Sequence, residues 1–286
     1  MNAYHSNREN LVRIFEDTLH LCEANEVLKK SVEESINNSV LYKENFYPEL
    51  PTKKFSATKI SVNKYRTFET VQFYKKKFPE IKVAALNFAS ATNVGGGVTK
   101  GSKAQEESLC RCSTLYPVLN TEYNLKNFYD FHRKKRDVRY TDSCIYSPNI
   151  VIFKSDTDLP QILPENKWTE ADILTCAAPN LRLNPNNFMN PNSDKPIKIS
   201  DDELYKIHLR RAEHILTIAA HHEVEILILG AFGCGAFQNN PHVVAEAYKN
   251  ICKRFIGYFK EITFSIYCPP QNANENFLVF NKAFTK

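Results

Sequence analysis

The 286-residue chain is predicted to adopt an α/β fold in which helices cover both faces of one sheet. From about residue 60 onward, short apolar segments of strand length alternate with segments of helical periodicity. These apolar segments are continuous runs without polar alternation, which is typical of strands buried on both faces. Residues 1–60 precede this pattern, and we expect them to form a helical accessory region packed on a main domain of residues 61–286.

The accessory region opens with a predicted amphipathic helix. The segment Ser6-Asn7-Arg8-Glu9 matches a capping box, in which two side chains satisfy free backbone N–H groups at a helix start. Apolar residues then follow at the spacing of one helix face, namely Val12, Phe15, Leu19 and Cys22. Residues 25–55 contain many Asn, Glu and Lys residues and two prolines, so we expect further helix and then an extended connector.

The main domain supplies strands and helices in alternation. The predicted strands are residues 59–65, 83–89, 149–154, 173–178, 225–229 and 262–267. The predicted helices are residues 67–78, 105–119 and 200–222, and a fourth that begins at Asn240-Pro241. Ser102 and Ser200 each open a capping-box sequence ahead of a helix. Residues 184–196 are rich in Asn and Pro and are predicted to form a surface loop.

Composition and charge exclude several classes of protein. With 43% hydrophobic and 24% charged residues, the chain is not intrinsically disordered. A net charge of +5 suits a polyanionic substrate but is also common on solvated surfaces, and no basic block is long enough for a nucleic-acid tail. No apolar run reaches the roughly 18 residues of a membrane span, and the N-terminus lacks a signal-peptide core. We therefore expect a soluble, monomeric, intracellular protein, cytoplasmic or, in a eukaryote, nuclear, without membrane contact or sequence-specific nucleic-acid binding.

The eight cysteines are expected to be reduced and buried. Several lie in apolar strands or helices, where cysteine behaves as a small hydrophobic residue. The sequence contains no Cys-x-x-Cys pair, and the helical spacing of Cys110 and Cys112 would point their thiols apart. A zinc site is the alternative, and this spacing does not favour it.

The most informative segment is a glycine-rich loop that follows the apolar strand at 83–88. The loop carries Gly95-Gly96-Gly97, whose bare backbone N–H groups would let an anion approach closely. Gln105-Glu106-Glu107 then opens a helix and places two carboxyl groups beside the loop. A phosphate cradle next to an acid pair suits cleavage of a sugar–phosphate compound at a glycosidic bond. A simple glycine-rich turn is the alternative, and the near match to a P-loop lacks the required lysine.

The two glutamates also have a purely structural interpretation. A carboxylate in the first turn of a helix is stabilised by the helix dipole, and Glu107 could pair with Arg111 four residues later. Both effects would keep the carboxylate ionised, whereas a general acid must hold a proton. A neighbouring like charge, partial burial and a bound diphosphate would favour the protonated form. The sequence leaves this balance open.

A second glycine-rich loop, at 230–239, lies between another predicted strand and helix. Gly233-Cys234-Gly235 lacks the third glycine of a dinucleotide-binding fingerprint, but its backbone and the next helix N-terminus could hold a pyrophosphate. Ala236 and Phe237 follow, and Phe237 either offers a flat face to a ribose or base or belongs to the core. Two such loops in one sheet favour a diphosphate-binding crevice.

These segments resemble a known family. The spacing of Gly-Gly-Gly and Gln-Glu-Glu resembles the catalytic motif of poly(ADP-ribose) glycohydrolases. Flanking segments resemble the bacterial-type branch in the same order, from about residue 8 to 280: LNFAS, LCRCSTLYPVL, YSPNIVIFKSD, TCAAPNL and LGAFGCGAFQNNP. The resemblance implies a macrodomain-like fold, a three-layer α/β/α arrangement around a mixed sheet, with an N-terminal helical accessory region. Segments 121–142 and 182–199 match only loosely, which leaves the substrate preference open.

The resemblance also assigns roles to individual residues. It makes Glu107 the catalytic acid and Glu106 its partner on the ribose hydroxyls. It implies that Phe237 packs on the distal ribose and that Asn87 ends the inner strand near the ligand. The substrate would then lie among Gly95, Gly96, Gly97, Gln105, Gly233, Cys234, Gly235, Ala236 and Phe237. No metal and no cofactor is implied.

The resemblance implies hydrolysis of ribose–ribose O-glycosidic bonds in poly(ADP-ribose), releasing ADP-ribose from the chain end if the accessory region closes the adenosine side. The expected partners are poly(ADP-ribose) or an ADP-ribosylated protein. Three alternatives remain: a macrodomain that binds ADP-ribose without turnover, a hydrolase that removes single ADP-ribose units from protein side chains, and an unrelated nucleotide-dependent transferase. The transferase would need a base or metal cluster, and His221-His222, expected to be solvated at a helix end, do not supply one.

Overall fold

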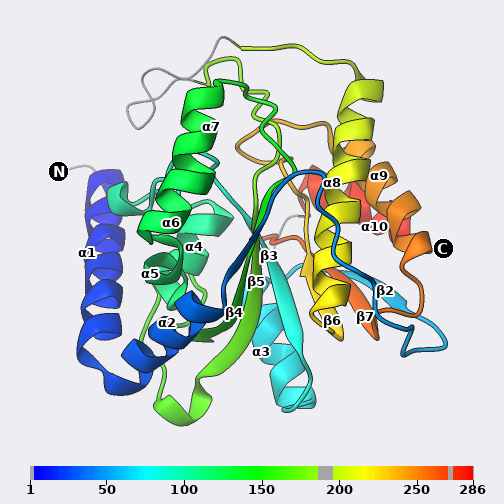
Figure 1. Cartoon of the computed structure of the whole chain (residues 1–286). Helices are drawn as coiled ribbons and strands as arrows, with labels where there is room; N and C mark the ends of the chain where they lie inside the picture. The colour runs from blue at the N-terminus through cyan, green and yellow to red at the C-terminus, as the bar shows by residue number, and fades with distance from the viewer. Residues whose placement is uncertain (1–2, 186–195, 270–272, 286) are drawn as a thin grey trace.

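The computed structural model describes residues 3–185, 196–269 and 273–285. These residues form a mixed sheet of seven strands in the order β1-β4-β5-β3-β6-β7-β2 (Figure 1). The strands are β1 (Val40–Tyr42), β2 (Lys59–Asn63), β3 (Val83–Phe88), β4 (Cys144–Ile152), β5 (Thr169–Cys176), β6 (Ile226–Leu229) and β7 (Glu261–Ser265). Neighbours from β5 to β2 pair in parallel, whereas β4 pairs antiparallel with β5 and β1 with β4.

Helices connect the strands and cover the sheet. The α-helices are α1 (Ala3–Ala24), α2 (Glu26–Asn38), α3 (Thr67–Lys77), α4 (Gln105–Cys112), α5 (Leu115–Leu119), α6 (Glu122–Asn124), α7 (Asp130–Lys135), α8 (Asp201–His221), α9 (Pro241–Arg254) and α10 (Glu275–Phe284). Other short helical segments are η1 (Val98–Lys100), η2 (Leu125–Tyr129) and η3 (Glu165–Lys167). Because β3 and β6 are parallel neighbours, the loops that follow them meet at the same edge of the sheet.

Two hydrophobic clusters lie on the two faces of the sheet. Helices α8, α9 and α10 pack on one face, where Leu216 and Tyr248 are fully buried (Figure 1). Helices α1, α3, α4 and α5 pack on the other face, where Phe68 and Leu109 are fully buried. Every residue of β6 and β7 is buried, as expected for strands covered on both faces. The predicted three-layer α/β/α fold is therefore confirmed.

The N-terminal segment both packs on the helical layer and extends the sheet. Lys154 is 2% exposed and donates hydrogen bonds to the Ile14 carbonyl (2.9 Å) and to Asp17 Oδ2 (2.7 Å) of α1. It also donates to Thr18 Oγ1 (2.8 Å). Residues 40–42 form β1 and so belong to the same sheet as the main domain. The predicted boundary at residue 60 between an accessory region and a main domain stays a prediction. The residues before it both pack on the helical layer, through α1, and belong to the sheet, through β1.

Several predicted elements of the main domain are confirmed with small shifts at their ends. The predicted segments 59–65, 67–78, 225–229 and 262–267 correspond to β2, α3, β6 and β7. Ser200 caps α8 by accepting a hydrogen bond from Glu203 N (3.1 Å). Asn240 caps α9 in the same way, from His242 N (3.1 Å), with Pro241 at the first helical position.

Two predicted capping boxes are wrong. Helix α1 begins at Ala3, so the segment 6–9 lies inside it. Helix α4 has Ala104 as its N-cap and no side-chain hydrogen bond there, so Ser102 does not cap it. The predicted helix 105–119 is also interrupted, because Ser113 adopts an extended conformation and pairs with Ile152 beside β4.

The remaining differences concern irregular or short elements. Strand β4 begins at Cys144, earlier than the predicted 149, and has a register shift at Pro148-Asn149 that masks its pattern in the sequence. The short strand β1 and the helix α10 were not predicted. Of the predicted loop at 184–196, residues 186–195 lie outside the described residues.

All eight cysteines are free thiols, and Cys234 is the one that is not fully buried. Of the two histidines predicted to be solvated, His221 is exposed, whereas His222 is only partly exposed. Its ring stacks on Tyr146 with 3.5 Å between centroids, and its Nε2 lies 2.8 Å from the Tyr42 hydroxyl. No helix in the described part of the chain has both the length and the apolar character needed to cross a membrane.

Candidate active site

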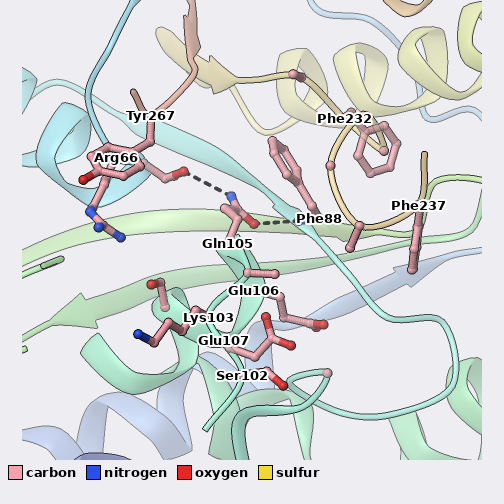
Figure 2. Close-up of a pocket in the computed structure, with 18 of the residues that line it drawn as sticks. Arg66, Phe88, Ser102, Lys103, Gln105, Glu106, Glu107, Phe232, Phe237 and Tyr267 are labelled. Atoms are coloured by element: carbon pink, nitrogen blue, oxygen red, sulfur yellow. Dashed lines mark hydrogen bonds between the residues drawn. The ribbon is translucent and has the colours of Figure 1, made fainter. Parts of the chain in front are cut away.

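The two glycine-rich loops at the ends of β3 and β6 enclose a cavity of about 770 Å³ (Figure 2). From the first loop and the start of α4, the cavity is lined by Gly96, Gly97, Gln105, Glu106 and Glu107. From the second loop, it is lined by Gly233, Gly235, Ala236 and Phe237. The fold therefore brings most of the predicted site residues to one place, although the two loops are far apart in the sequence.

Three predicted residues do not line the cavity. Asn87, the penultimate residue of β3, is fully buried, and its Nδ2 donates a hydrogen bond to Glu106 Oε1 (3.4 Å). Gly95 faces Tyr116, whose ring would lie 2.8 Å from a Cβ at this position. The Cys234 side chain packs against the hydrophobic core. The structure therefore places these three residues beside the cavity lining and not in it.

Glu106 is a buried carboxyl group at the start of α4. It is 3% exposed, and its Oε2 accepts a hydrogen bond from Ser90 N (2.7 Å) in addition to the Asn87 bond on Oε1. Burial, and then the negative charge of Glu107, raise the pKa of Glu106 well above its usual value. Two adjacent carboxyl groups in such a site compete for ionisation, so the pair favours holding one proton.

Glu107 is the member of the pair with a free oxygen. It is 7% exposed, and its Oε1 accepts a hydrogen bond from Gly97 N (2.8 Å). Its Oε2 is buried and has no hydrogen-bond partner among the described residues. The other three oxygens of the pair each accept an N–H bond. Glu107 Oε2 is therefore the one oxygen of the pair that receives no hydrogen bond from the described residues.

The ion pair that the helical spacing suggested between Glu107 and Arg111 does not form. The buried Arg111 guanidinium instead donates to the carbonyl of Ser102 (2.6 Å). Ser102 N in turn donates to the carbonyl of Gly97 (3.1 Å), which closes the turn whose N–H group binds Glu107. The Arg111 carbonyl accepts from Thr18 Oγ1 of α1 (2.6 Å). Arg111 thus connects the accessory helix to the loop that orients the carboxyl group.

Gly96 leaves room for the carboxyl pair. Its φ of +59° lies in the left-handed region, which favours glycine. A Cβ at Gly96 would lie 2.7 Å from Glu107 Oε1 and 3.0 Å from Glu106 Oε2. A residue larger than glycine would therefore push on both carboxyl groups.

Gln105, the first residue of the Gln-Glu-Glu motif, connects the backbone elements around the site. Its Oε1 accepts from Phe88 N (2.9 Å) at the end of β3 (Figure 2). Its Nε2 donates to the Leu86 carbonyl (2.7 Å) and to Thr67 Oγ1 (3.1 Å) at the start of α3. The Gln105 amide therefore fixes where α4, and with it the two carboxyl groups, begins relative to the sheet.

Asn239 holds the second loop in shape. Its Nδ2 donates to the carbonyls of Phe237 (3.1 Å) and Pro179 (2.7 Å). Its Oδ1 lies 2.7 Å from Nε2 of the buried His208. Gly233, with φ of +79°, packs so closely on Asn239 that a Cβ would lie 2.9 Å from the side-chain amide. The loop therefore has a fixed backbone beneath an exposed tip.

The tip of the second loop faces the cavity. Gly235 and Ala236 are exposed, and no heavy atom lies within 4 Å of a Cβ placed on Gly235. Phe237 is half-buried, with the Arg182 guanidinium 5.5 Å from the centre of its ring. Backbone N–H groups and an aromatic face are therefore available to a ligand at this end.

The opposite end of the cavity carries residues that sequence reasoning missed. Figure 2 shows Arg66 and Tyr267 there, and the guanidinium lies 3.9 Å from the centre of the tyrosine ring. The nearby Asp156 is 3% exposed, and burial raises its pKa to about 6. These residues come from distant segments and belong to no motif. The one feature of the sequence that could have indicated this end of the cavity is the position of Arg66, directly after the predicted strand 59–65.

The comparisons with known proteins agree with this geometry. The family model of the microbial-type PARG (poly(ADP-ribose) glycohydrolase) catalytic domain matches residues 9–155. The PARG structure from Thermomonospora curvata is 28% identical, with a TM-score of 0.81, and the match covers 97% of this chain and 100% of that one. The structure of PARG from Deinococcus radiodurans with ADP-ribose is 29% identical, with a TM-score of 0.73 and coverage of 89% and 97%. No curated protein matches the sequence.

A single sheet covered by helices on both faces, with two glycine-rich loops and a buried carboxyl pair at its strand ends, defines a macrodomain-like glycohydrolase. More particularly, the chain belongs to the microbial-type poly(ADP-ribose) glycohydrolase family.

Alanine substitutions at Gly96 and Gly235 should separate the roles of the two loops. Gly96→Ala forces a left-handed backbone on a residue with a Cβ, which costs about 1–2 kcal/mol, and it also displaces Glu107. We expect a lower melting temperature and a lower rate. Gly235→Ala is the matched control, because its Cβ meets open space, so its melting temperature should stay that of the wild type. Equal melting temperatures for the two variants would contradict this assignment.

Glu106→Gln should stabilise the protein at neutral and alkaline pH. A carboxyl group whose pKa is raised on folding contributes stability at low pH, and this contribution is lost as the pH rises through the folded pKa. The glutamine amide does not ionise, so it removes this loss of stability. Its NH2 group can donate a hydrogen bond to Asn87 Oδ1, which lacks a partner among the described residues. We expect a higher melting temperature at pH 8, by about 2–4 °C for each kcal/mol recovered. The gain should shrink toward pH 4, and a gain that grows with acidity would refute the assignment.

Proposed function

We propose that this chain releases ADP-ribose from the end of poly(ADP-ribose), with Glu107 acting first as an acid and then as a base. The family to which the chain belongs hydrolyses ribose–ribose O-glycosidic bonds of this polymer, and this is the activity of the chain. The observation that supports the role of Glu107 is its free Oε2 beside Glu106, whose pKa is raised. Such a pair holds a proton in the cavity at the pH where free carboxyl groups have lost theirs.

The contacts that the cavity offers favour one orientation of a bound ADP-ribose. PARG from D. radiodurans binds ADP-ribose, and PARG from T. curvata binds the inhibitor ADP-HPD, which supports the same ligand class here. In this orientation the diphosphate lies over the exposed backbone of Gly235 and Ala236. The distal ribose rests on Phe237 near the carboxyl pair. The adenosine then extends toward Arg66 and Tyr267, whose flat groups suit a purine.

Hydrolysis follows in two steps. Glu107 gives its Oε2 proton to the oxygen that joins the distal ribose to the next unit, and the bond from C1 to that oxygen breaks with its electrons passing to the oxygen. The positive charge that develops at C1 is stabilised by the nearby diphosphate and by the Glu107 carboxylate. The carboxylate then takes a proton from water, whose oxygen bonds to C1. One carboxyl group thus acts twice, unlike the two carboxyl groups of most glycosidases.

Two alternative functions would use the same cavity. A protein that only binds ADP-ribose has no need of a buried acid with a free oxygen, so the Glu107 geometry favours turnover. Removal of single ADP-ribose units from protein side chains would use the same acid and the same water. Incubation with polymer and with singly modified protein, followed by separation of the products, distinguishes this activity from polymer cleavage.

Glu107→Gln should abolish turnover while preserving ligand binding. The amide keeps the hydrogen bond from Gly97 N, so the loop should stay in place, but it cannot give and take a proton. We expect a loss of at least about 100-fold in kcat, as is usual for a general acid–base group. The Kd for ADP-ribose, measured by calorimetry, should stay within a few-fold of the wild-type value. A rate close to that of the wild type would assign the acid to another residue.

The enzyme should cut from the polymer end. Helix α1 reaches the cavity, because Arg8 is one of its lining residues and the Arg8 carbonyl would lie 2.5 Å from a Cβ on Gly101. An accessory helix seated there restricts the cavity to a terminal unit. We therefore expect free ADP-ribose at the earliest time points of polymer digestion on a gel. An early ladder of intermediate oligomers would disprove end-cutting and leave the glycohydrolase activity standing.

A further inference from the structure

Arg182 lies next to Phe237, and its guanidinium is oriented by the side chain of Asn180. Its Nε donates to Asn180 Oδ1 (3.0 Å), and Leu181 N donates to the carbonyl of Phe237 (3.0 Å). Asn239 also joins the two segments, through the carbonyls of Pro179 and Phe237. The segment 179–182 and the second glycine-rich loop are therefore joined by several hydrogen bonds and present the Phe237 ring and the Arg182 guanidinium together at the cavity.

The guanidinium of Arg182 keeps donors available for a ligand. Within the described ranges no carboxylate lies at ion-pair distance from it, and the residue lines the cavity. The neighbouring surface arginine Arg139 differs, because its guanidinium is bound by Asp137 (3.0 Å) and Glu203 (3.3 Å). A partly buried, oriented guanidinium without an acidic partner is suited to an anionic or aromatic group from a ligand.

The proposed reaction identifies which part of the substrate reaches Arg182. The terminal distal ribose lies on Phe237, and the polymer continues from its C1 through the oxygen that Glu107 protonates. The first groups beyond the broken bond are therefore the adenosine and diphosphate of the next ADP-ribose unit. With its guanidinium 5.5 Å from the Phe237 ring centre, Arg182 is within reach of that unit.

We infer that Arg182 forms a subsite for the nucleotide of the leaving unit, and that this subsite makes the enzyme prefer polymer over substrates with small leaving groups. This inference rests on the proposed function of the cavity. The planar guanidinium can bind a phosphate through paired hydrogen bonds or stack on the purine. A protein side chain or a simple phenol as leaving group offers neither a phosphate nor a purine, so Arg182 contributes nothing to its release.

The test compares two substrates of one enzyme. The first is poly(ADP-ribose), and the second is ADP-ribose joined through C1 of its distal ribose to 4-nitrophenol. Arg182→Ala should lower kcat/KM for the polymer about tenfold or more, the usual effect of losing a hydrogen bond to a charged group. It should change kcat/KM for the phenol substrate by less than about twofold. Arg182→Lys keeps the charge without the planar fork, and we expect it to lie between the wild type and Arg182→Ala for the polymer.

Arg139→Ala is the matched control, because it removes a nearby guanidinium that does not line the cavity. Its ratio of the two kcat/KM values should equal that of the wild type. Equal losses on both substrates in Arg182→Ala would show that Arg182 only supports Phe237, and no loss on the polymer would show that it does not contact the leaving unit. Either result overturns the subsite while the glycohydrolase function stands. Inactivity of the wild type on both substrates would instead remove the proposed function, and the subsite with it.

Discussion

The burial of two adjacent carboxyl groups is the constraint on which the site depends. Glu106 and Glu107 are 3% and 7% exposed, and buried carboxylates are costly unless donors surround them. Three N–H donors compensate, from Ser90, Asn87 and Gly97. Each of these donors comes from the end of β3 or from the loop that follows it. The strand and the glycine-rich loop therefore supply the donors that stabilise the acid pair among the described residues, and Glu107 Oε2 is the oxygen left without a donor.

The accessory helix takes part in the same network. Arg111 reaches the Ser102 carbonyl on one side and is held by Thr18 of α1 on the other. The buried Lys154 side chain donates to Thr18 as well, so Thr18 joins α1 both to the backbone of α4 and to the segment that follows β4. A buried guanidinium is costly to leave unpartnered, and burial lowers the pKa of Arg111. Through Thr18 and Arg111, α1 is thus connected to the turn whose N–H group binds Glu107.

Local patterns predicted most of the fold and the motif residues, and long-range packing decided the rest. The continuous apolar runs of β6 and β7 and the caps at Ser200 and Asn240 depend on neighbours in sequence, so the sequence reveals them. The Ser102 capping box is wrong, because α4 has Ala104 as its N-cap. The carbonyl of Ser102 is bound instead by Arg111 across the turn, a contact that rules based on neighbouring residues do not include. Arg66, Asp156 and Tyr267 meet only through the sheet order, and their shared cavity could not be predicted from three separate segments.

The two glycine-rich loops look alike in sequence, but a different structural constraint acts on the glycine of each. In the first loop, Gly96 is confined between the two carboxyl groups, so its small size serves the acid pair. In the second, Gly235 borders open space, so its backbone is accessible to the diphosphate of the proposed ligand. The carboxyl pair and the proposed diphosphate site thus lie on two separate loops. In the proposed function, changes around the second loop, where Phe237 and Arg182 lie, would alter the fit to the leaving group without disturbing the carboxyl pair, so one catalytic apparatus could serve different leaving groups.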